Sequence, residues 1–105
     1  MILIGVFLFA KYEYDHTFST ARWIKHPNKR IDMVQNLLSS HDLIGESKEQ
    51  ILRLLDEPRN EFETHSKDNF SYFLGSNKAF GLDVNYLFIT FTDDIVASVR
   101  IVNQD

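Results

Sequence analysis

The sequence predicts an α+β fold in which two N-terminal helices pack on one face of a three- to four-stranded antiparallel sheet, a two-layer sandwich. Residues 28–41 have helical periodicity, a second helix begins at Ser47, and from residue 61 onward the periodicity changes to that of strands. Both helices precede the strands, so the sheet is the surface that their apolar sides can cover. The chain of 105 residues suffices for one domain with a modest core.

Residues 1–26 are expected to form an apolar segment and a connector, and residues 27–105 a single α+β domain. From Met1 to Ala10 the chain is continuously apolar, yet a membrane-spanning helix needs about 20 such residues. A secretory signal would have a positively charged start and a cleavage site, which are missing here. We expect the C-terminal part of an anchor or signal segment, from a truncated or misassigned start. A buried strand is the alternative, because Ile, Val and Phe dominate.

The first predicted helix follows an irregular connector. Residues 12–26 show neither strand nor helix periodicity, apart from a helical turn near Thr20. Pro27 suits the first turn of a helix, where its missing N–H costs nothing. Residues 28–41 then form an amphipathic helix with one apolar stripe, made of Ile31, Val34 and Leu38.

The second predicted helix has a defined start. Ser47 and Gln50 have the spacing of a capping box, in which each side chain bonds the backbone N–H of the other residue. Glu49 near the start and Arg53 near the end complement the helix dipole. Pro58 prevents the helix from continuing.

Four strands are predicted after this helix. Residues 61–64 are polar and are expected at an edge, residues 70–74 form a clearer strand, and residues 86–92 and 95–102 form a hairpin joined by Asp93 and Asp94. The expected core consists of Val34, Leu37, Leu38, Ile51, Leu54, Leu55, Phe73, Leu87, Ile89, Phe91, Ala97, Val99 and Ile101. The opposite face of the sheet is expected to leave three aromatic side chains partly exposed, Tyr72, Tyr86 and Phe88.

A search for catalytic or metal-binding motifs is negative. The absence of cysteine excludes disulfides, thiolate metal sites and cysteine nucleophiles. The four histidines form no H-x-x-x-H pair, and no G-x-S-x-G or phosphate-binding glycine loop occurs. Asp93 and Asp94 are explained by the turn. We therefore expect no enzyme activity, no cofactor and no metal.

Charge restricts the classes of partner. The net charge of −4 makes the folded part a poor general binder of nucleic acid. A basic segment that starts at Arg22, ends at Arg30 and contains Trp23 is a candidate contact for anionic lipid headgroups. The alternative is a solvated linker with one packed tryptophan, since charge runs usually face water.

The succession LIGESKEQILRLLDEP, followed by FSYFLG and then YLFITFTDDIV, resembles small bacterial proteins of the SmpA/OmlA type over about residues 30–102. This resemblance implies a membrane-tethered, non-enzymatic protein of the cell envelope that binds other proteins or lipid headgroups. The lipid-modified cysteine of the outer-membrane assembly lipoprotein is absent, so lipoprotein status is not carried over.

Asp56 is the second departure from that pattern, which has glycine there. Glycine closes a helix readily in a conformation with positive φ, whereas Asp adopts it at a cost. Asp56 and Glu57 also place negative charge at the negative end of the helix dipole. The sequence therefore predicts a strained helix end, and a gain of about 1 kcal/mol for Asp56→Gly.

Two functional hypotheses are preferred at this point over a third, an enzyme that uses scattered carboxylates and histidines. The first is a non-catalytic protein-interaction module of the bacterial envelope, tethered by its N-terminus, with Tyr72, Tyr86 and Phe88 in the contact surface. The second is a soluble cytoplasmic inhibitor or immunity-type protein, in which Met1 to Ala10 is a core strand and the acidic surface suits a basic target.

Overall fold

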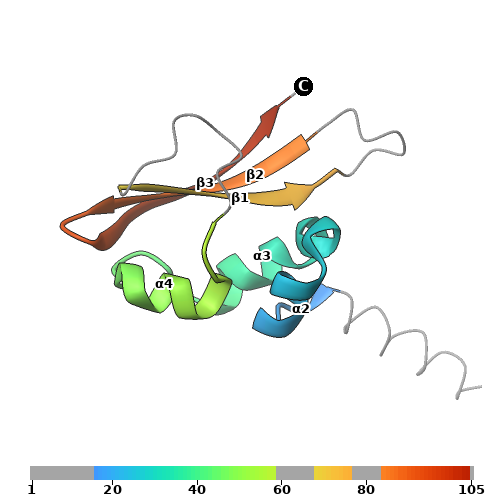
Figure 1. Ribbon diagram of the computed structural model, residues 1–105, viewed down its shortest axis with the longest axis horizontal. Helices are drawn as coiled ribbons and strands as arrows, with labels where there is room; N and C mark the ends of the chain where they lie inside the picture. The colour runs from blue at the N-terminus through green and yellow to red at the C-terminus, as the bar shows by residue number, and fades with distance from the viewer. Residues whose placement is uncertain (1–15, 59–67, 77–83, 105) are drawn as a thin grey trace, which may run out of the picture.

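The computed structural model describes residues 16–58, 68–76 and 84–104 (Figure 1). The order of elements is α2 (Thr20–Lys25), the 3₁₀ helix η1 (Pro27–Lys29), α3 (Arg30–Ser40), α4 (Lys48–Leu55), β1 (Asn69–Gly75), β2 (Val84–Thr92) and β3 (Ile95–Gln104). The α+β class is thereby confirmed, and Figure 1 shows the helices on one side of the sheet. The strand predicted at residues 61–64 lies outside the described residues.

Packed structure begins before residue 27, within the segment expected to be a connector. The predicted turn near Thr20 is a complete helix, α2, whose first turn is capped by the Ser19 side chain. Trp23 in this helix is 0% exposed and belongs to the core. Pro27 begins η1 as its position predicts, and η1 leads directly into α3 at Arg30.

The predicted capping box of α4 is confirmed. The Gln50 N–H donates to Ser47 Oγ over 3.1 Å, and the Ser47 N–H donates to Gln50 Oε1 over 3.0 Å. The helix ends at Leu55, and Asp56 has φ 65° and ψ −178°. This combination is essentially restricted to glycine and costs other residues about 1–3 kcal/mol. Asp56 is thus more strained than an ordinary left-handed helix cap.

The sheet has the order β1-β2-β3, and both pairings are antiparallel. The predicted hairpin is confirmed: Asp93 and Asp94 have φ values of 53° and 63°, which suit a two-residue turn whose twist matches the strands. The start of α4 contacts this turn. Lys48 Nζ lies 3.1 Å from the Asp94 carboxylate, and the Lys48 N–H donates to the Asp94 carbonyl.

A bulge in β3 changes which of its residues face the core. Phe91 pairs with Val96, but Thr90 pairs with Ser98, so Ala97 is an extra residue between these two pairs. Val96 is 2% exposed whereas Ala97 is exposed, and the prediction of Ala97 as a core residue is therefore wrong. After the bulge the expected alternation resumes, with Val99 and Ile101 packed against the core.

Strand β1 has the opposite phase to the predicted one. Tyr72 pairs with the buried Leu87 and is 1% exposed, whereas Phe73 pairs with Tyr86 and is only half-buried. The predictions of Phe73 in the core and of Tyr72 on the open face are both wrong. Leu74 lies at a second bulge, next to Gly75.

Gly75 holds the end of β1 against η1. Its φ is 102°, and a Cβ on this residue would lie 2.9 Å from the Asn28 carbonyl oxygen. Any other residue would therefore force the strand and the helix apart as well as strain the backbone. This close approach places β1 directly beside η1 and the start of α3.

The strain at Asp56 leads to a quantitative expectation. Asp56→Gly should raise the free energy of unfolding by about 1–2 kcal/mol. Glycine adopts the positive φ without strain, and the substitution also removes a negative charge from the end of α4. Urea unfolding of the two proteins at pH 7 measures the difference.

Asp56→Asn is the matched control, because it removes the charge and keeps the Cβ. We expect it to gain about 0.5 kcal/mol or less. Equal gains for the two variants would show that the effect comes from the charge, and would contradict the backbone strain at Asp56.

Candidate interaction surface

The face of the sheet that points away from the helices, here called the outer face, carries two neighbouring rows of paired residues. The strand register and the alternation of side chains place these residues there. One row consists of Phe73, Tyr86 and Val102, and the next of Ser71, Phe88 and Arg100. Aromatic side chains therefore occupy adjacent positions on the central strand.

The aromatic side chains of the outer face are held in place by their neighbours. The rings of Phe73 and Tyr86 meet edge to face, with centroids 5.9 Å apart. The Arg100 guanidinium lies 5.5 Å from the centre of the Phe88 ring, which is cation–π distance. Tyr86 and Phe88 are half-buried and Arg100 is exposed, whereas Ser71 is 1% exposed. The accessible part of this face thus lies over β2 and β3.

Tyr72 does not belong to this surface. Its ring packs edge to face against Trp23 and Phe70, with centroids 6.1 Å away in each case. Its hydroxyl donates to the Asp56 carbonyl oxygen over 2.8 Å, just after α4. Burial raises the pKa of this hydroxyl far above its ordinary value; Asp56 and Glu57 raise it further, and Arg30 acts in the opposite direction. Of the three aromatic residues predicted for partner binding, only Tyr86 and Phe88 remain accessible.

In the basic segment from Arg22 to Arg30, two residues, Trp23 and Arg30, contact the rest of the folded chain. Trp23 is buried, as the packed-tryptophan alternative expects. Arg30 Nε donates to the Trp23 carbonyl over 2.7 Å, and its Nη1 donates to the Phe73 carbonyl over 3.1 Å. Lys25 and Lys29 remain exposed. A lipid contact would therefore use these two lysines without the tryptophan.

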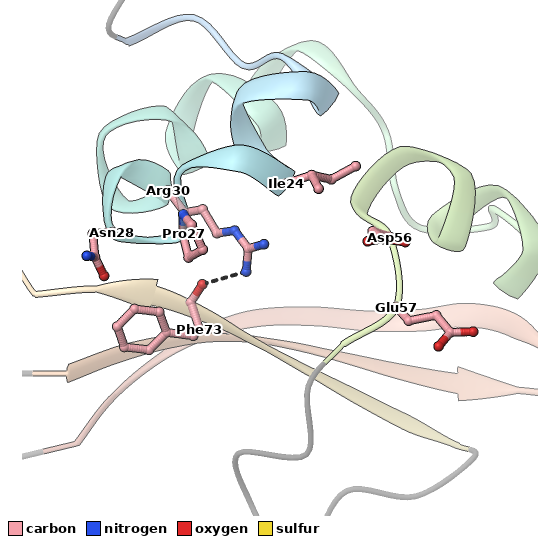
Figure 2. Close-up of a pocket in the computed structure, with 7 residues that line it drawn as sticks. All are labelled: Ile24, Pro27, Asn28, Arg30, Asp56, Glu57 and Phe73. Carbon is pink, nitrogen blue, oxygen red and sulfur yellow. Dashed lines mark hydrogen bonds between the residues drawn. The ribbon is translucent and has the colours of Figure 1, made fainter.

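A cleft of about 370 Å³ lies beside Arg30, between the first helices, the exit from α4 and strand β1 (Figure 2). Figure 2 shows Arg30 reaching toward the Phe73 carbonyl on one side and Asp56 and Glu57 on the other side. The remaining lining residues are Ile24, Pro27 and Asn28. Among the described residues that line this cleft, there is no serine, threonine, histidine or lysine to act with the two carboxylates, so we assign it no reaction.

The described residues form no cluster of metal ligands. Over residues 16–58, 68–76 and 84–104, no three His, Cys, Asp or Glu side chains come together as metal ligands. His41 packs edge to face on Phe18, with centroids 5.5 Å apart. No helix in this part of the chain has both the length and the apolar character of a membrane span. His65, one of the four histidines, lies outside the described residues.

The buried Tyr72 hydroxyl gives an expectation for alkaline pH. Above pH 10 the unfolded chain ionises this tyrosine while the folded protein keeps it protonated. Its contribution to stability is therefore complete below pH 10 and falls by about 1.4 kcal/mol per pH unit above it.

Tyr72→Phe should lose about 1 kcal/mol at pH 7, from the missing hydrogen bond, and should have a shallower alkaline slope. The two curves then converge near pH 11 in urea unfolding measured from pH 7 to pH 11. Phe88→Leu, on the outer face, removes no ionisable group, so it serves as the control and should keep the parent slope. Parallel curves for Tyr72→Phe and the parent protein would contradict this account.

Comparison of the chain with protein-family models, with curated proteins and with solved structures found no match. The resemblance to SmpA/OmlA-type proteins thus stays a prediction from the sequence motif. The function is best argued from the arrangement of the chain's own residues.

Proposed function

We propose that this protein is a non-catalytic interaction module that binds a protein partner through the outer face of its sheet, with Tyr86 and Phe88 as the central contacts. The observation that carries the proposal is the pair of half-buried aromatic side chains beside the exposed Arg100. The two-layer arrangement expected from the sequence supports it, because the described helices lie on one side of the sheet and none of them covers the outer face.

The chemistry of these side chains suits a protein interface. Tyrosine, phenylalanine and arginine are enriched at interfaces, and tyrosine and arginine are frequent among the residues that dominate binding energy. The edge-to-face contact of Tyr86 with Phe73 and the contact of Phe88 with Arg100 restrict these side chains before binding. Such preorganisation lowers the entropy lost on association.

A location at the cell envelope is part of the same proposal. Its support is the apolar run from Met1 to Ala10, together with the resemblance to envelope proteins. Lys25 and Lys29 would add an electrostatic attraction to anionic headgroups. The soluble cytoplasmic inhibitor is the alternative, and it needs residues 1–10 as part of the folded core.

Site-specific photo-crosslinking in cells tests the outer face. A photoreactive phenylalanine analogue at position 88 should yield a discrete adduct with a partner, whereas the same analogue at the exposed Gln35 on α3 should not. For the double variant Tyr86→Ser, Phe88→Ser, the photoreactive analogue is placed instead at the neighbouring outer-face residue Val102. The amount of adduct should then be at least about tenfold lower than with Tyr86 and Phe88 present, since each such contact contributes on the order of 1–2 kcal/mol.

Tyr72 is left unchanged in this experiment, because serine at that buried position would disrupt the core. A folded double variant that retains the full adduct would remove Tyr86 and Phe88 from the contact surface.

Fractionation of the full chain tests the location. We expect the protein in the membrane fraction, and we expect a variant lacking residues 1–10 to become soluble with an unchanged unfolding midpoint, since a tether contributes nothing to the core. Full solubility of the parent chain, together with unfolding of the shortened one, would favour the cytoplasmic alternative.

A further inference from the structure

The outer edge of β3 is a second candidate surface, distinct from the aromatic face. Within residues 16–58, 68–76 and 84–104, the contacts of the chain close only the first part of this edge. The Gly45 N–H donates to the Val96 carbonyl over 3.0 Å, and the Val96 N–H donates to the Glu46 carbonyl over 2.9 Å. Ser47 forms an antiparallel bridge with Ile95. The loop before α4 thus already pairs with β3 as a very short strand would.

Beyond this closed part, none of the described segments pairs with the outward hydrogen-bonding groups of β3. Val96 directs its backbone groups away from β2, and the alternation that resumes after the bulge gives Val99, Ile101 and Asn103 the same orientation. Among the described residues, no backbone group outside β2 pairs with these three. The edge from Ser98 to Asn103 therefore presents a row of available N–H and C=O groups.

The composition of β3 does little to protect this edge. Edge strands are usually shielded by proline, by several charges or by a covering segment. The strand IVASVRIVNQ contains no proline and one charged residue, Arg100. Val99 and Ile101 are half-buried, so apolar surface accompanies the open backbone groups. Ile44, just before the closing loop, is 57% exposed.

We propose that this open edge binds an extended segment of a partner protein by strand addition, and that the segment carries a carboxylate side chain opposite Arg100. A residue opposite Arg100 in an added strand lies about 5 Å away between Cβ atoms, where opposite charges attract and like charges repel. Apolar residues on either side of that carboxylate would contact Val99 and Ile101 and extend the core sideways.

A second copy of this chain is a poorer occupant of the edge. Strand β3 contains no acidic residue, so self-pairing offers Arg100 no opposite charge. Antiparallel pairing centred on Ile101 would place Arg100 opposite Val102 of the second copy. The two arginines would then occupy diagonal neighbouring positions on one face of the joined sheet, where their charges repel.

Strand addition uses the backbone groups of β3 and shares one side chain, Arg100, with the proposed function, whose central contacts are Tyr86 and Phe88 on β2. The two surfaces can therefore be tested separately. The probe is a blocked synthetic peptide of sequence Thr-Val-Glu-Val-Thr, which places glutamate opposite Arg100 and valines opposite Val99 and Ile101. Hydrogen exchange of individual amides is followed by NMR on the full chain.

In the free protein, the Val99 and Ile101 amides should exchange faster than those of Arg100 and Val102, which point toward β2. Peptide at about ten times its Kd should slow exchange at Val99 and Ile101 by about tenfold. Lysine in place of the peptide's glutamate should weaken binding by a factor of about three.

Two controls separate backbone pairing from other contacts. A peptide with N-methylated valines keeps the side chains and removes hydrogen-bond donors, so it should give no protection. Ile101→Pro removes the outward N–H together with the Ile side chain and should abolish binding, while Ile101→Ala removes the side chain alone, keeps that donor and should retain most of the binding. The Tyr86→Ser, Phe88→Ser double variant should bind the peptide like the parent protein.

The proposal is overturned if the parent peptide gives no protection at Val99 and Ile101, or if the N-methylated peptide protects them equally. Protection that rises with protein concentration without peptide would identify a second copy as the occupant, and would also overturn it. Loss of peptide binding in the aromatic double variant would place the peptide on the outer face instead.

Discussion

The guanidinium of Arg30 joins parts of the chain that are far apart in sequence, and the position of the core depends on it. It donates to the carbonyl of Trp23 in α2 and to that of Phe73 in β1, and it lies 4.8 Å from the centre of the Trp23 ring. Hydrogen bonds from a charged donor are worth about 1.5–3 kcal/mol each. The planar fork of donors serves both carbonyls at once, which a lysine ammonium does less well.

This contact has consequences for the sheet. It holds Trp23 against the ring of Tyr72, and Tyr72 in turn bonds the carbonyl of Asp56 at the end of α4. The close approach of Gly75 to Asn28 fixes the same side of β1 against η1. The inward orientation of Tyr72 therefore agrees with three separate contacts, and the outward orientation of Phe73 follows from it.

Local chemical signals in the sequence predict where the second helix starts and where the hairpin turns. They do not predict which residues of a strand face the core. Ser47 with Gln50 and the pair Asp93 and Asp94 act through their own backbone neighbourhood, and both predictions are confirmed. Five residues reading FSYFL contain apolar or aromatic side chains on both faces, so alternation could not select the buried one.

Two further features could not be predicted from the sequence, for physical reasons. The extra residue Ala97 in β3 leaves no mark in a run of alternating small and apolar side chains. Helix α2 has six residues, too few for a 3.6-residue period to show the burial of Trp23 among charged neighbours. The sequence predicts Tyr86 and Phe88 on the outer face, because β2 is long and its buried and less buried side chains alternate regularly.

The partly closed edge of β3 also has a consequence for the behaviour of the protein at high concentration. An open edge rich in Val and Ile is a template on which chains can add to one another without limit, as in amyloid growth. Here the Gly45–Ser47 loop already pairs with the first residues of β3, and the bulge at Ala97 increases the local twist of the strand. The remaining run is short and twisted, a geometry that accepts one added strand and opposes the flat stacking of many.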